Sequence, residues 1–180
     1  LRYSVYGDPL LAKRSENTVV SYFLIGYGIV SSFVKDEHII QGINGISGEI
    51  GGLERIDGET IHNRCSIPEL IKRANAISKC ENLNDLLKLY DTNQEVHKLV
   101  LESAKYLAYD IDCITNALGS NNVIMFGETI NFGNEYKDVI QMQLNKSSSF
   151  MRNVEFVDSK TYRFSGMVKK LQDHIIRCIM

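Results

Sequence analysis

The sequence predicts an α/β fold in which a mixed sheet is flanked by helices. Two apolar, β-branched segments at 18–25 and 29–34 are joined by a glycine turn, as is typical of neighbouring strands. A long amphipathic pattern at 93–118 predicts a helix, and shorter strand and helix patterns alternate after it. Hairpin strands followed by strand-helix-strand-helix order indicate a mixed sheet.

The amino-terminal residues alternate in polarity, so a short strand is expected at 1–6, ended by Gly7-Asp8-Pro9. A brief helix is expected from Pro9, because proline is tolerated in the first turn of a helix. The strand at 18–25 is almost continuously apolar, as expected when both faces of a strand are covered.

Turn residues separate the next elements. Gly26-Tyr27-Gly28 leads into the strand at 29–34, and Lys35-Asp36-Glu37 is a polar hairpin turn. Residues 38–41 are expected to return as a third strand. A glycine-rich loop then runs from Gly42 to Gly52.

Capping motifs mark the helices that follow. Ser66 opens a capping box and is the expected N-cap of a helix. The expected buried face of that helix is Ile67, Leu70, Ile71, Ala74 and Ile77. A short helix is expected around 84–90, and the longest at 93–118, capped by Thr92 and ended by Gly119.

The carboxyl-terminal part alternates between the two element types. A buried strand is expected at 123–126, a helix at 135–144 and a strand at 154–157. A final helix is expected from Ser165, with its buried face at Val168, Leu171, Ile175 and Ile176. No repeat or linker interrupts this order, so residues 1–180 are expected to form a single domain.

Composition narrows the class of protein. The chain is 44% hydrophobic and 23% charged, like ordinary soluble globular proteins, and no apolar run approaches the roughly 20 residues of a membrane span. A net charge of −2 with scattered basic residues argues against direct binding to a nucleic-acid backbone. The four cysteines, at 65, 80, 113 and 178, form no Cys-x-x-Cys pair, and free cysteines are typical of a cytoplasmic protein.

Four segments in order resemble the ROK family of sugar kinases and repressors. The most specific is Gly42 to Gly52, which is similar to the family's Gly-x-Asn-Gly-x-x-Gly-Glu-x-Gly-His. The other three resemble its Gly-Thr-Gly-Ile-Gly phosphate loop, the Gly-Gly turn near the nucleotide and the Ala-Gly-Leu-Ile before the last helix; they are 24–30, 121–128 and 165–168. The resemblance implies the carboxyl-terminal lobe of an actin-like, ribonuclease H-like ATPase fold. The first lobe and any DNA-binding domain would then lie outside these residues.

Several positions depart from what phosphoryl transfer requires. Tyr27 stands where the family has threonine, and Val30 replaces the last glycine of the loop, so both put bulk near the expected phosphate path. The Gly-Gly turn is Gly127-Glu128 here, which places a carboxylate near the polyphosphate position. The phosphate-loop positions Gly26, Tyr27, Gly28 and Gly127 are therefore interpreted as degenerate, and no cofactor is expected.

The zinc site that the resemblance implies is also incomplete. The family uses the histidine of Glu-x-Gly-His and three cysteines, whereas this chain has Gly52 and a single matching cysteine, Cys65. One thiolate cannot make a tetrahedral site. His62 is interpreted as a loop histidine, so no metal is expected.

Three residues are candidates for contact with a sugar. Glu49 matches the family glutamate that accepts hydrogen bonds from sugar hydroxyls, a task that suits a carboxylate; a solvated loop carboxylate is the alternative. Asn44 lies in the same motif, where it would otherwise satisfy loop backbone groups. Asp8 lies near the place of the family's catalytic aspartate, but Gly7 replaces the asparagine before it, and Asp8 is equally consistent with a turn residue.

The resemblance implies a ligand-sensing or oligomerisation domain of a ROK-type transcriptional regulator of sugar metabolism, without kinase activity. The expected partners are a sugar or sugar-phosphate effector and further copies of the chain, as a homodimer or larger homo-oligomer. DNA would be contacted only through an upstream domain, and no membrane partner is expected. A divergent ATP-dependent sugar kinase is the alternative, which a functional Asp8 would favour. A lobe that binds only a protein partner is the third hypothesis.

Overall fold

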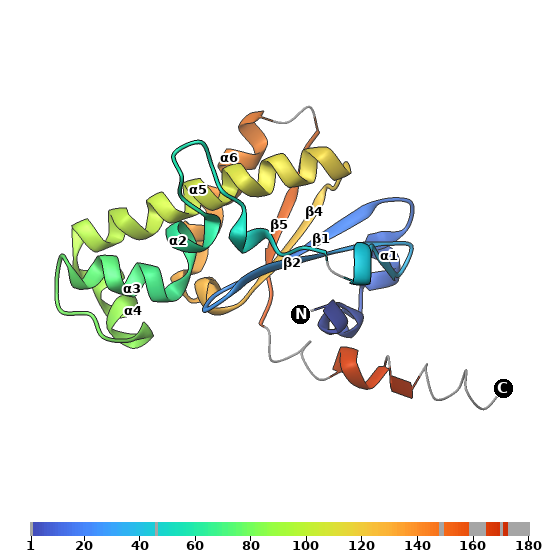
Figure 1. Ribbon diagram of the computed structural model, residues 1–180, viewed down its shortest axis with the longest axis horizontal. Helices are drawn as coiled ribbons and strands as arrows, with labels where there is room; N and C mark the ends of the chain where they lie inside the picture. Colours follow the sequence, from blue (N-terminus) through green and yellow to red (C-terminus); the bar gives the residue numbers. More distant parts are fainter. Residues whose placement is uncertain (1, 46, 148–149, 159–164, 170, 173–180) are drawn as a thin grey trace.

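The computed structural model describes residues 2–45, 47–147, 150–158, 165–169 and 171–172. Over these residues it confirms the α/β fold, with a five-stranded sheet of order β3-β2-β1-β4-β5 at its centre (Figure 1). Strands β1, β2 and β3 pair antiparallel, whereas β1, β4 and β5 run parallel. The sheet is therefore mixed, as predicted.

The strands form where the sequence predicts them, to within two residues at each end. They are β1 (Val19–Ile25), β2 (Ile29–Lys35), β3 (His38–Ile39), β4 (Asn122–Phe126) and β5 (Asn153–Phe156). Alternate side chains of β1 enter two different cores: Phe23 and Ile25 pack in the larger one, and Val20 and Tyr22 in the smaller one. A strand with both faces buried needs apolar residues on both, which explains its continuous apolar run.

Among the described residues, five helices cover the larger core on one face of the sheet. They are α2 (Ile61–Cys65), α3 (Ile67–Asn75), α4 (Leu83–Thr92), α5 (Gln94–Leu118) and α6 (Gly133–Ser147). In Figure 1 they gather on one side of the strands, with α5 running across them. Helix α5 packs against α2, α4 and α6, so its buried stripe forms the centre of this core.

The smaller core lies under the 3-10 helix η1 (Arg2–Gly7) and helix α1 (Leu11–Ser15). The strand expected at 1–6 is therefore wrong over its described residues. Val5 packs into this core beside Leu11, so the apolar residues of the segment cover a sheet face instead of pairing with a sheet edge. The brief helix expected from Pro9 forms as α1, but it begins at Leu11 with Leu10 as its N-cap, so Pro9 precedes the helix and is not part of its first turn.

The long helix α5 ends as predicted but begins differently. Gly119 is its C-cap with a φ of +64°, the left-handed region that favours glycine. The N-cap is Asn93, whose side chain accepts hydrogen bonds from the backbone N–H groups of Glu95 and Val96 at 3.0 and 3.2 Å. Thr92 instead ends α4, so the predicted cap is wrong by one residue.

Residues 165–169 and 171–172 are helical, as expected for the last helix. Val168 and Leu171 are 52% and 60% exposed, however, so their predicted burial is wrong in this structure. Neither belongs to a core cluster of the described residues. Ile175 and Ile176 lie outside the described residues. Within the part of the chain that the structure describes, no helix has the length and apolarity needed to cross a membrane.

Candidate functional site

A surface cavity of about 520 Å³ is lined by three separate segments of the chain. Its lining comes from the start of β2 (Gly28, Ile29, Val30), the glycine-rich loop (Glu49, Gly51, Gly52) and the start of α2 (Thr60, His62, Asn63). Glu49, which is predicted to contact a sugar, thus lines the same cavity as Gly28 of the segment that resembles the phosphate loop. We take this cavity as the candidate site.

The glycine-rich loop lies directly against β2. The carbonyl of Gly48 accepts hydrogen bonds from the backbone N–H and the hydroxyl of Ser31, at 2.6 and 3.2 Å. Gly48 has a φ of +78°, and a Cβ there would lie 2.0 Å from the carbonyl oxygen of Ser31. A Cβ on Gly51 would lie 2.7 Å from the carbonyl oxygen of Ile29. Close backbone contact therefore requires glycine at both positions, and the exposed Glu49 is held between them at the cavity.

The predicted phosphate loop forms the turn between β1 and β2, where the N–H of Gly26 donates to the carbonyl of Gly28 at 3.1 Å. The carboxylate of Glu128 lies against this turn, since a Cβ on Gly26 would be 1.7 Å from its Oε2. Tyr27 is 54% exposed. The group that fills the space beside Gly26 is therefore the carboxylate of Glu128 rather than the phenol that the sequence singles out.

Gly127 brings this carboxylate to the turn. It precedes the 3-10 helix η4 (Glu128–Phe132), has a φ of +111°, and would place a Cβ 2.4 Å from the carbonyl oxygen of Ile25. The hydroxyl of Thr129 donates to the same carbonyl at 2.9 Å. The two segments interpreted as degenerate phosphate-loop positions therefore meet, with the Glu128 carboxylate at their junction.

Asp8 is not among the residues that line the cavity. Its carboxylate accepts hydrogen bonds from the Tyr22 hydroxyl and the Leu10 N–H, both at 2.8 Å, and pairs with Nε of Arg14 at 3.2 Å. Arg14 also donates to Glu155 at 2.7 Å. The Asp8 side chain has no exposed surface, so this network ties α1 to β1 and β5 and encloses the carboxylate.

Asn44 also lies outside the cavity lining. It is exposed in the 3-10 helix η2 (Ile43–Gly45), with φ and ψ of 53° and 27°. Two residues that the sequence analysis did not predict take part instead: Thr60 is the N-cap of α2, and its hydroxyl accepts a hydrogen bond from the N–H of Asn63 at 3.1 Å. The available sequence signal was Thr60 itself, because threonine is a favoured N-cap residue. The helix after it has only five residues, which is too short to show a helical pattern in the sequence.

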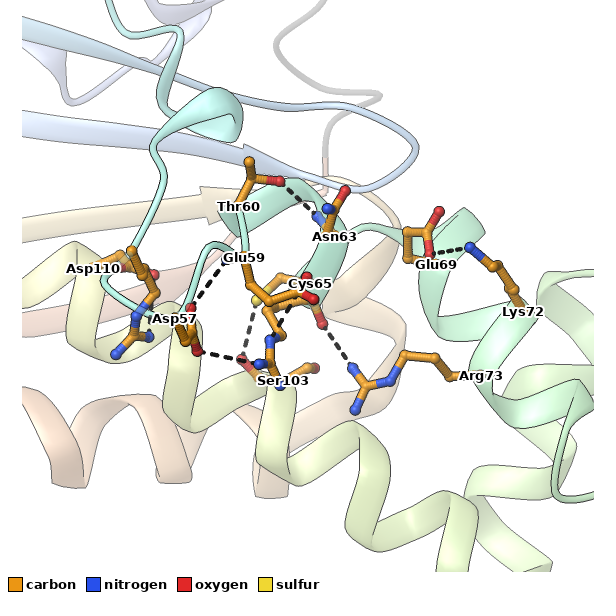
Figure 2. Close-up of polar contacts among 12 residues, drawn as sticks. Asp57, Glu59, Thr60, Asn63, Cys65, Glu69, Lys72, Arg73, Ser103 and Asp110 are labelled. Atoms are coloured by element: carbon orange, nitrogen blue, oxygen red, sulfur yellow. Dashed lines mark hydrogen bonds and ion pairs between the residues drawn. The ribbon is translucent and has the colours of Figure 1, made fainter.

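The residues present do not fit the zinc site of the family. Cys65 has no exposed surface, and its thiol donates to the carbonyl of Ser103 at 3.4 Å (Figure 2). Burial raises the pKa of this thiol to about 12, which disfavours the thiolate that binds metal. Among the described residues, no three His, Cys, Asp or Glu side chains are grouped so that they could hold a metal ion.

No protein-family model matches the sequence, and no curated protein matches it. Solved structures do match. A ROK hexokinase from Thermus thermophilus has a TM-score of 0.77 at 16% identity, covering 93% of this chain and 63% of that one.

Two further matches differ in kind. A ROK family protein from Streptococcus pneumoniae in complex with sucrose has a TM-score of 0.77 at 11% identity, covering 96% of this chain and 64% of that one. A ROK family transcriptional regulator, a homolog of the E. coli MLC protein, has a TM-score of 0.71 at 12% identity, covering 94% and 50%.

The chain thus spans less than two thirds of the length of these structures. Kinases and a regulator both appear among the matches, so the likeness concerns the fold and not one activity. The fold that the sequence motifs led us to expect is confirmed: the chain has the fold of ROK-family proteins.

Proposed function

We propose that the chain is the ligand-sensing lobe of a ROK-type transcriptional regulator of sugar metabolism, without kinase activity. The observation that carries the proposal is the carboxylate of Glu128 against Gly26. Phosphoryl transfer requires hydrogen-bond donors and cations around a polyphosphate, and a carboxylate at this junction repels one. A regulator needs no such cradle.

The cavity supports a sugar as the ligand. Glu49 offers a carboxylate that can accept charge-assisted hydrogen bonds from vicinal hydroxyls, and Thr60, His62 and Asn63 add polar groups to the lining of the cavity. One of the matching ROK proteins was solved with sucrose. Such a regulator would act in the cytoplasm as a homo-oligomer and would contact DNA through a separate domain.

The second candidate is a divergent ATP-dependent sugar kinase. It is favoured by the sugar kinases and glucokinases among the matching structures. The enclosure of Asp8 by Tyr22 and Arg14 counts against it, because a general base must reach the hydroxyl that it deprotonates.

A thermal-shift screen of the full-length protein against sugars, sugar phosphates and magnesium-ATP tests the proposal. A sugar at a hundredfold excess over its Kd should add about 2.7 kcal/mol to the free energy of unfolding, and magnesium-ATP should add nothing. Glu49→Gln should weaken the sugar response by about tenfold in Kd, whereas Glu54→Gln, an exposed residue outside the cavity lining, should not. Stabilisation by magnesium-ATP would favour the sugar-kinase function over the regulator. No response to any sugar would contradict the ligand-sensing function.

Replacing Glu128 with glycine should create affinity for a nucleotide. The substitution removes both the charge and the bulk beside Gly26. We expect magnesium-bound nucleotide to bind Glu128→Gly at least about tenfold more tightly than the parent, measured by calorimetry. Glu128→Gln separates the two causes, because it keeps the bulk and removes the charge. If all three proteins bind nucleotide equally, Glu128 does not block the loop.

A further inference from the structure

Residues 53–65 carry one wall of the cavity. The segment folds back on itself as a hairpin. The N–H of Arg55 donates to the carbonyl of Glu59 at 3.0 Å, and the N–H of Ile61 donates to the carbonyl of Leu53 at 3.2 Å. Ile56, near its tip, is fully exposed. Because Thr60 pairs with Glu54 in the hairpin and His62 and Asn63 come directly after it, the position of all three depends on how the segment is attached to the body of the protein.

Two arginines attach the segment to aromatic rings of α5. The guanidinium carbon of Arg55 lies 5.1 Å from the ring centroid of Tyr106 and 4.6 Å from that of Tyr109. The guanidinium carbon of Arg64 lies 4.7 Å from the Tyr106 centroid. One tyrosine therefore contacts an arginine from each end of the segment, within the range of cation–π attraction.

Each of the two guanidinium groups also has a carboxylate within ion-pair distance. Arg55 Nη1 lies 3.8 Å from Oδ2 of Asp110 on α5, and Arg64 Nη2 lies 3.2 Å from Oδ2 of Asp57 in the hairpin. Figure 2 shows Asp57, Asp110 and Cys65 around this attachment. The Arg55 and Asp110 side chains are 23% and 13% exposed, so their ion pair is less screened by solvent than a surface pair. Asp57 is 43% exposed, so its pair with Arg64 is more strongly screened.

This is the segment in which the resemblance implies metal ligands, and its residues do not fit a metal. We propose that Arg55 and Arg64, stacked on Tyr106, form an arginine clamp that positions residues 53–65, and with them Thr60 and Asn63, without a bound metal. Arg55 and Arg64 are thus positioning residues for the candidate site. The inference rests on the proposed function only in assuming that the cavity binds a sugar. Whether the clamp attaches residues 53–65 to α5 can be tested without any ligand.

Hydrogen exchange followed by mass spectrometry on the full-length protein tests the clamp. In the Arg55→Met, Arg64→Met double variant, amides of residues 53–65 should exchange at least about tenfold faster, while those of β1 and β4 should change less than about threefold. Tyr106→Leu should have the same local effect and serves if the double variant does not fold. Lys72→Met is the matched control, because Lys72 is exposed on α3 and pairs with Glu69 outside the clamp.

A metal chelator should leave exchange of residues 53–65 unchanged in the parent protein. Faster exchange on chelation would overturn the proposal, as would unchanged exchange in both clamp variants. A uniform acceleration of all amides would also overturn it, because it would mean that the arginines stabilise the whole fold rather than position this segment. Each outcome is independent of whether a sugar binds, so the failure of the clamp and the failure of the sensor are distinguishable.

Discussion

Arg152→Ala is expected to lower the free energy of unfolding by about 3 to 5 kcal/mol, because it leaves a buried carboxylate without its charge partner. Arg152 is 3% exposed. Its Nη1 donates to Asp112 and, at 3.1 Å, to the carbonyl of Leu144, and its Nη2 donates to Asn116. The guanidinium also lies 4.8 Å from the ring centroid of Phe150. One side chain therefore joins α5, α6 and the segment before β5.

Urea denaturation with the free energy extrapolated to water measures this effect. Lys146→Met on α6 is the matched control, since Lys146 is an exposed cation and should change stability by less than about 0.5 kcal/mol. Replacing Arg152 with methionine and Asp112 with leucine together should recover part of the loss, because no buried charge remains unpaired. A loss below about 1 kcal/mol in Arg152→Ala would show that the network contributes little.

Gly48→Ala is expected to cost about 3 kcal/mol or more and to abolish the response to sugar. An alanine at a φ of +78° is strained, and its Cβ would overlap the carbonyl of Ser31, 2.0 Å away. The loop can relieve the overlap only by leaving β2. Glu49, the next residue, would then leave the cavity.

Gly52→Ala is the matched control for this prediction. Gly52 belongs to the same motif and lines the same cavity, but a Cβ there meets no atom within 4 Å. Its stability should stay within about 0.5 kcal/mol of the parent. Equal stability of the two variants, measured by denaturation, would contradict the docking of the loop on β2.

The strands and helices could be predicted because local patterns agree with the tertiary environment. The strand β1 is apolar on both faces and is buried on both, and Gly119 stands at the left-handed C-cap of α5. Caps were less predictable. Ser66 precedes α3 as expected, but its hydroxyl makes no capping bond, so only the backbone boundary was right. Ile77, expected on the buried face, lies beyond the end of α3 and is 38% exposed.

The candidate site could be predicted only where the motif itself determines contacts. Gly48 and Gly51 are needed because the glycine-rich loop packs closely against the backbone of β2. Their spacing on either side of Glu49 can be recognised in the sequence. The Asp8 carboxylate is enclosed by the Tyr22 hydroxyl, which comes from β1, and by Arg14, which also binds Glu155 on β5. No local sequence pattern signals such contacts, so the burial of Asp8 could not be predicted from its motif.

The order of strands also has a consequence for synthesis on the ribosome. The antiparallel partner of β1 is β2, which follows it directly in the chain, whereas the partner at its other edge, β4, is made much later. The Ser21 and Ser120 hydroxyls, which form a hydrogen bond beside the β1–β4 pair, are 99 residues apart in the sequence. At about 5 to 20 residues per second, the apolar β1 edge is uncovered for roughly 5 to 20 s. The nascent chain therefore passes through an aggregation-prone stage that the finished sheet no longer shows.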